Sequence, residues 1–132
     1  MVIDNLIQQY KSRVLRRNFF LMIIIKLKRD RSYNIIGFAG SGHAEYGEYG
    51  QDIVCAGISA IMQTAVLGLT DYLDFDINID VKDGWLDCQL TSDIAQDQQV
   101  KAILETMLVG LKGIQAEYSE YIKIIEGGGK ND

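Results

Sequence analysis

The chain is 132 residues long, 48% hydrophobic and 23% charged, with a formal net charge of −5 at pH 7. These values exclude fibrous and disordered classes, and the length suits one domain that folds without disulfide staples. The acidic balance disfavours nucleic acid as the main ligand, because phosphate binding needs clustered Lys and Arg. An acidic protein instead favours binding of a basic peptide.

The first 21 residues differ in character from the rest. They contain four basic residues and one acidic residue, and their apolar residues recur at helical spacing, which predicts an amphipathic helix. Arg16-Arg17 ahead of an apolar run resembles a twin-arginine export signal. Lysines interrupt that run and no small-residue cleavage site follows, so export is disfavoured. We interpret 1–21 as an N-terminal extension, either non-native or poorly ordered, ahead of a domain that begins at Met22.

The first half of this domain predicts a hairpin and a buried helix. The β-rich runs Ile23–Lys28 and Tyr33–Gly40 form the hairpin, a loop over 44–51 follows, and a helix spans Ile53–Leu69. The helix is apolar on nearly every side and needs cover on more than one face. We expect a second copy of the chain to supply part of it, which predicts a homodimer. No unbroken apolar stretch approaches the ~18 residues of a membrane span, so none is expected.

The second half predicts two strands joined by a tight Asp-Gly turn, a helix and a last strand. The expected segments are Phe75–Val81, Trp85–Leu90, Val100–Ile114 and Tyr118–Ile125. The order β-β-α-β-β-α-β predicts a two-layer α+β domain over 22–126, with a mostly antiparallel sheet packed by two helices. Residues 127–132 are Gly-rich at their start and predict a flexible tail.

A candidate catalytic pair stands out. The only histidine and one of the two cysteines, His43 and Cys55, lie twelve positions apart. Asp52 is a favoured N-cap, so Cys55 falls in the first turn of the expected helix, where unpaired N–H groups and the helix dipole lower a thiol pKa. His43 follows the second strand, and a loop containing Gly47 and Gly50 can return the chain to it. These residues predict a nucleophile activated by a base, with the oxyanion held by N–H groups at the helix start, including that of Cys55.

Less specific interpretations exist for most of these residues. Considered without its neighbours, Cys55 is interpreted as a small buried hydrophobic residue, and Cys88 is interpreted as part of the core. Gly47 and Gly50 are turn residues or hinges of a lid over the substrate. Tyr46 and Tyr49 line a peptide groove or simply cover the loop. Ser59 lies one helical turn after Cys55, where its hydroxyl orients His43 or bonds back to a backbone carbonyl. One histidine and no Cys-x-x-Cys motif leave a structural zinc site without ligands, so neither metal nor cofactor is expected.

Three short motifs resemble a known family. Gly42-His43-Ala44, Asp52-Ile53-Val54-Cys55-Ala56 and Ser59-Ala60 are similar to motifs of the ribosomal-processing cysteine protease family, Prp, of Firmicutes and related bacteria. The resemblance extends more loosely from about Met22 to Ile125. It implies a cytoplasmic cysteine endopeptidase that removes the N-terminal extension of a large-subunit ribosomal protein through a thioester intermediate. His43 is then the base and Cys55 the nucleophile, and Asp52 is either a third catalytic member or the helix cap.

Two other functions remain open at this level. In the first, the chain is a non-enzymatic, ribosome-associated domain whose 42–55 segment grips a protein tail, and Cys55 is only packing. In the second it is a redox or thiol-transfer enzyme. The second is disfavoured because no resolving cysteine lies near Cys55 in the sequence.

Overall fold

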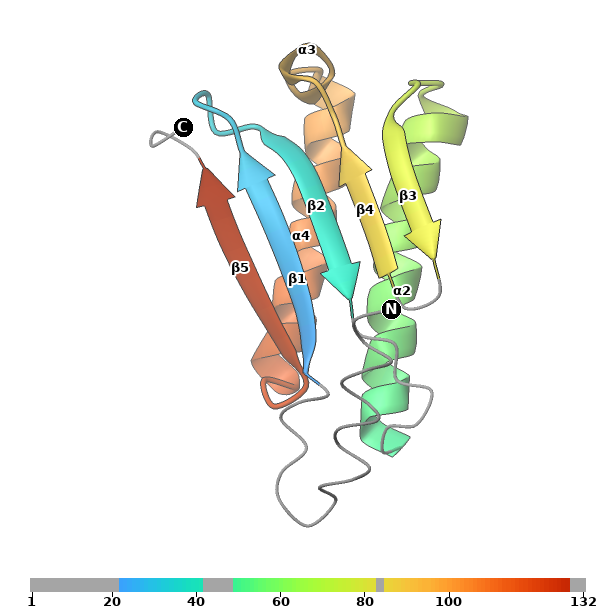
Figure 1. Cartoon of the computed structure of the whole chain (residues 1–132), viewed down its shortest axis with the longest axis vertical. Coiled ribbons are helices and arrows are strands. Elements are labelled where there is room, and N and C mark those ends of the chain that lie inside the picture. Colours follow the sequence, from blue (N-terminus) through green and yellow to red (C-terminus); the bar gives the residue numbers. More distant parts are fainter. Residues whose placement is uncertain (1–21, 42–48, 83–84, 129–132) are drawn as a thin grey trace.

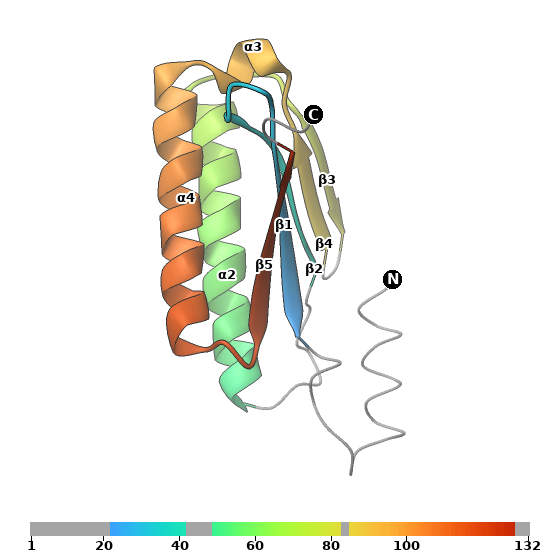
Figure 2. The ribbon, with the colours of Figure 1, turned by 90° about the vertical axis from the view of Figure 1, so that its left-hand side faces the viewer.

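The computed structural model describes residues 22–41, 49–82 and 85–128, and for residues 49–52 it describes the backbone alone. One face of a twisted sheet carries both long helices, so the fold has two layers (Figures 1 and 2). The elements in chain order are β1 (Ile23–Arg29), β2 (Ile35–Ser41), α2 (Tyr49–Leu67), the π-helical turn η2 (Gly68–Tyr72), β3 (Asn78–Lys82), β4 (Trp85–Gln89), α3 (Ser92–Ala95), α4 (Gln98–Glu117) and β5 (Ile122–Gly128).

The sheet has five strands in the order β3-β4-β2-β1-β5. Three of the four pairings are antiparallel, and only β1 with β5 is parallel. The predicted two-layer α+β fold with a mostly antiparallel sheet is therefore confirmed. The parallel pair follows from chain order, because β5 returns after α4 and joins the free side of β1.

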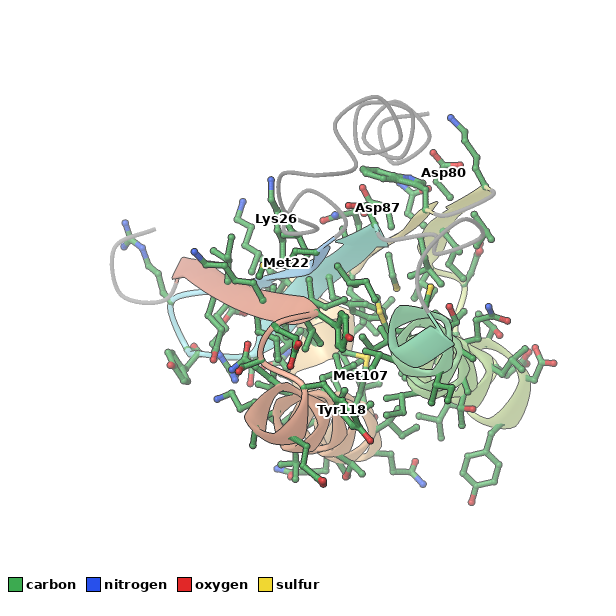
Figure 3. The ribbon with its side chains drawn as sticks, turned by 90° about the horizontal axis from the view of Figure 1, so that it is seen from below. Met22, Lys26, Asp80, Asp87, Met107 and Tyr118 are labelled. Carbon is green, nitrogen blue, oxygen red and sulfur yellow. The ribbon has the colours of Figure 1, made fainter. Side chains whose placement is uncertain are left out.

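The core lies between the sheet and the two long helices. Alternate residues of β1 are buried while the residues between them are exposed or partly exposed, as expected for a strand with one covered face. Figure 3 shows Lys26, Asp80 and Asp87 on the face of the sheet that points away from the helices. The largest fully buried side chains are Phe38, Ile25, Leu69, Leu104, Leu111, Ile122, Val100 and Cys88.

Several boundaries differ from those predicted. β3 begins at Asn78, three residues later than expected, because the chain first leaves η2 through Asp74, whose φ is +61°. β5 begins at Ile122, since a turn joins the Tyr121 N–H to the Tyr118 carbonyl at 2.8 Å. β5 also continues through Gly128, which pairs with Arg29, two residues into the segment expected as a tail.

One helix is long and apolar enough, by length and composition, to cross a membrane among the residues that the structure describes. It runs over Ile53–Tyr72, and 33% of its most apolar part is buried inside the protein. The expectation from the sequence considered only unbroken apolar runs. The mean hydropathy of this helix is high even though it contains polar residues such as Ser59 and Gln63. The core helix of a globular protein meets the same criterion.

A buried arginine joins three elements at the far end of β1. Arg29 is 5% exposed, and its guanidinium binds Glu105 of α4 at 2.7 and 3.3 Å and Glu126 of β5 at 3.2 Å. It also donates to the Tyr33 carbonyl and lies over the Tyr33 ring. Glu105 and Glu126 raise the pKa of Arg29, with the Glu105 hydrogen bond contributing most. Charge pairing thus allows a guanidinium to be buried there.

Candidate active site

A cavity of about 250 Å³ lies between α2 and the ends of strands β2 and β3 and the start of β4. Cys55, Ser59 and Gln63 line it from α2, and Ser41 lines it as the last residue of β2. Apolar residues make up much of the remaining wall: Ile25, Ile58, Met62, Trp85 and Leu86. The cavity therefore brings together a thiol, two hydroxyls and an apolar wall large enough for a side chain.

The two cysteines lie in opposite environments. Cys55 is partly exposed at the cavity, whereas Cys88 on β4 is 0% exposed inside the core. Burial raises the pKa of the Cys88 thiol to about 12, with a further contribution from the charge of Asp87. A thiol in that state stays protonated and out of reach of a substrate near neutral pH. The sequence-based interpretation of Cys88 as core is confirmed.

Several predicted site residues lie outside the described ranges. These residues are Gly42, His43, Tyr46 and Gly47. Tyr49 and Gly50 are the first two residues of α2, so the helix begins inside the segment expected as a loop.

The predicted cap of α2 is wrong. The helix begins at Tyr49, so Asp52 is its fourth residue and Cys55 its seventh. Capping preference is worth only about 1 kcal/mol, and it does not stop the residues before a favoured cap from joining the helix.

This start also removes one expected oxyanion donor. The N–H of the seventh residue of an α-helix bonds to the carbonyl of the third, so the Cys55 N–H is used within α2. The unpaired N–H groups belong to the first four residues. The expectation that Cys55 itself lies in the first turn and donates its N–H to the oxyanion is therefore wrong for this helix.

The cavity wall contains residues that the sequence analysis did not select. Trp85 and Leu86 begin β4, Lys82 ends β3, and Met62 lies two turns after Cys55 on α2. The only available signal was the single tryptophan of the chain directly after a hairpin turn. The strands bring Lys82, Trp85 and Leu86 to Cys55 from about 30 positions away, and no local spacing in the sequence indicates that they approach it.

Similarity to known proteins agrees with this geometry. The family model described as cysteine protease Prp matches residues 22–123. A Staphylococcus aureus ribosomal processing cysteine protease Prp is 43% identical over 86 residues, which cover 63% of this chain and 78% of the relative. The Bacillus subtilis protein of the same name is 29% identical over 107 residues, covering 78% of this chain and 96% of the relative.

Solved structures show the same fold. The S. aureus ribosomal processing protease Prp in complex with a substrate peptide has a TM-score of 0.74 at 30% identity, covering 80% of this chain and 100% of that chain. A Streptococcus mutans structure has a TM-score of 0.71 at 26% identity, covering 81% of this chain and 95% of the other. The family match spans most of the described domain, and it decides against a non-enzymatic binding domain and against a redox enzyme. The chain belongs to the Prp family of ribosomal processing cysteine proteases.

Proposed function

We propose that Cys55 is the nucleophile of this protease and His43 its base, and that the substrate is the N-terminal extension of a large-subunit ribosomal protein. One observation carries the choice of nucleophile. Of the two cysteines in the chain, Cys55 lines a cavity and Cys88 is fully buried. A cysteine protease needs a thiolate that a peptide can reach, and Cys55 alone meets that need.

The position of β2 supports His43 as the base. β2 ends at Ser41, which lines the same cavity as Cys55, and His43 follows two residues later. His43 is also the only histidine of the chain, and imidazole is the most common general base.

The proposed reaction is acyl transfer in two halves. His43 takes the proton of the Cys55 thiol, and the sulfur attacks the scissile carbonyl carbon. The tetrahedral intermediate collapses as the C–N bond breaks, His43 gives its proton to the leaving amine, and a thioester remains on Cys55. Water, deprotonated by His43, then attacks the thioester. The second product leaves with a free carboxylate and the thiol is restored.

The other predicted residues receive supporting roles in this proposal. Ser59 lies one turn after Cys55 and lines the same cavity, which supports a role in orienting the imidazole. Asp52 lies in the first turn of α2, one turn before Cys55, which is compatible with a third catalytic member as well as with stabilisation of the helix. The remaining predicted positions are proposed to contact or cover the substrate: Gly42, Tyr46 and Gly47, together with Tyr49 and Gly50 at the start of α2.

The chemistry of the site also supports a peptide substrate. The apolar wall of the cavity suits an apolar side chain next to the scissile bond, and the net charge of −5 favours approach of a basic segment such as a ribosomal protein tail. The S. aureus relative has been solved with a substrate peptide. Action on a ribosomal protein before its assembly requires the cytoplasm, where we place this protein.

A homodimer is proposed from the uncovered helix face. A groove of about 660 Å³ runs between α2 and α4, lined by small and apolar residues such as Ala60, Ala102 and Met107. Leu67 and Val109 are 54% and 69% exposed. The sequence from Ile53 to Thr70 carries no charged residue. A two-fold contact between copies brings this face against itself and buries apolar surface without burying charge.

Mass spectrometry of peptide cleavage tests the proposed reaction. Peptides copying the N-terminal extensions of large-subunit ribosomal proteins are incubated with the wild type, Cys55→Ala, His43→Ala and Cys88→Ala. We expect the wild type and Cys88→Ala to release one N-terminal fragment, and both site variants to leave the peptide intact while retaining the wild-type circular dichroism spectrum. Cleavage by Cys55→Ala would contradict the assignment of the nucleophile.

A further inference from the structure

The two edges of the sheet are not equivalent. At the β5 edge, the side chain of Gln115 on α4 reaches over and accepts a hydrogen bond from the Ile124 N–H at 2.8 Å. A backbone donor on that strand is therefore used by the protein itself. At the other edge, no described strand pairs with the outer side of β3 (Figure 1). An edge strand in this state presents backbone donors and acceptors to a partner.

The register of the β3–β4 hairpin identifies the groups on that edge. Lys82 pairs with Trp85 across a two-residue connection, and in such hairpins the closing pair exchanges hydrogen bonds. Alternate residues back along β3 then bond to β4 as well. The residues between them, Ile79 and Val81, direct their N–H and C=O groups to the free edge.

The free edge is continuous with the cavity that contains Cys55. Val81 and Lys82 line that cavity together with Cys55. Val81 pairs with Leu86, which is buried in the core, so both side chains point to the helix layer. Val81 is nevertheless 59% exposed. Asp80 next to it points to the opposite face (Figure 3). Val81 therefore offers an exposed apolar surface, on the helix side of the sheet, next to the free backbone groups of β3.

We propose that an extended segment of the substrate, flanking the scissile bond, pairs with Ile79 and Val81 as a sixth strand of the sheet. The inference rests on the proposed function. Backbone pairing with β3 holds the substrate segment whatever its sequence. The inward-pointing side chains of the substrate cover Val81, and the substrate residue that follows them places its side chain in the cavity towards Cys55. Substrate is thereby positioned by main-chain hydrogen bonds on one side of the scissile bond and by the apolar wall at the bond itself.

A peptide fits this edge better than a second copy of the chain does. β3 has only five residues, and two of them, Asp80 and Lys82, are charged and exposed. Short edge strands with charged residues disfavour edge-to-edge pairing between copies. A peptide drawn into the cavity gains contacts that an edge-to-edge dimer does not.

The test is a cleavage series in which each backbone amide on either side of the scissile bond is N-methylated in turn. We expect kcat/KM to fall about fivefold or more at every second position on one flank, with the methylated positions between them close to the unmodified peptide. Sensitivity restricted to the residues at the scissile bond, with no alternation, would overturn the inference while leaving the protease assignment intact. Failure of the wild type to cut the unmodified peptide would overturn both.

Two matched variants locate the effect on the protein. Val81→Asp places an inward-pointing charge on the free edge, and Ile125→Asp places a charge on β5 at a side chain that is 41% exposed and lies on the opposite face of the sheet. We expect Val81→Asp to raise KM about fivefold or more with kcat less affected and to abolish the alternation, while Ile125→Asp matches the wild type. If Val81→Asp instead dissociates a dimer and leaves KM unchanged, the edge is occupied by a second copy and the inference is wrong.

Discussion

Gly40 and Met62 pack so closely that a methyl group on Gly40 would have to displace the Met62 side chain by a few tenths of an ångström. A Cβ at Gly40 would lie 3.0 Å from both Sδ and Cε of Met62, and 3.1 Å from Cδ1 of Ile25. All three residues line the cavity that contains Cys55. The absence of a side chain at Gly40 therefore allows Met62 of α2 to pack directly against β2 beside the cavity.

Gly40→Ala is expected to lower both stability and activity. The added methyl group pushes Met62 away or separates β2 from α2, and overpacking of this kind costs about 1–3 kcal/mol. Gly37→Ala is the control on the same strand, because its Cβ would meet only the end of the Gln89 side chain, which is exposed and can move. Urea unfolding and kcat/KM on a cleaved peptide measure the two effects. Equal values for both variants would show that the Gly40 spacing is unimportant.

The ion pairs around Arg29 predict a stability that decreases in acid. Lys112, at 3.1 Å, and then Arg29 hold the pKa of Glu126 below its ordinary value. A carboxyl group whose pKa is lower in the folded state stabilises the fold above its unfolded pKa of about 4.3, and loses that contribution as the pH falls through the folded value.

Glu126→Gln tests this relation by thermal unfolding at a series of pH values. We expect the variant to melt below the wild type at pH 7 and the difference to shrink as the pH falls below about 4. Glu117→Gln, at the exposed end of α4, serves as control and should follow the wild type throughout. A difference for Glu126→Gln that is the same at pH 3 and pH 7 would contradict the role of its charge.

The exposed helix face predicts a self-association that one charge disrupts. Val109 is 69% exposed on α4, next to Gly110 and the groove with α2. In a two-fold dimer through this face, residue 109 of each copy lies against the apolar surface of the other copy. The Val109→Asp substitution would bury an unpaired carboxylate there, which is costly. Sedimentation equilibrium should show a dimer for the wild type and a monomer for the variant. A wild type that sediments as a monomer at micromolar concentration would refute the homodimer.

Local patterns predicted most of the fold. Alternation in β1 and three- and four-residue spacing in α4 follow from which faces must be buried, and both appear in the short sequence windows that form these elements. The start of α2 was misplaced because the cap preference of Asp52 is weaker than the tendency of a helix to extend. The onset of β3 was misplaced because alternation continues through Asp74–Ile77, which the turn after η2 keeps out of the sheet.

The site was predictable only in part, for a topological reason. Cys55, Ser59 and the His43 spacing are local features of the sequence. The opposite wall, with Trp85 and Lys82, reaches the cavity only because β4 pairs with β2 and β3 pairs with β4. The free β3 edge likewise depends on which strand is outermost. Strand order is a long-range property that local spacing does not specify.

Thiol alkylation measures the central claim most directly, because it reports on the nucleophile without needing the natural substrate. The folded wild type is treated with iodoacetamide at pH 6, and modification of Cys55 and Cys88 is followed by peptide mapping. We expect rapid modification of Cys55, slower modification of Cys55 in His43→Ala, and none of Cys88, whose thiol is fully buried with its pKa raised to about 12. A Cys55 that reacts no faster than Cys88, or at a rate unaffected by His43→Ala, would contradict the proposed pair.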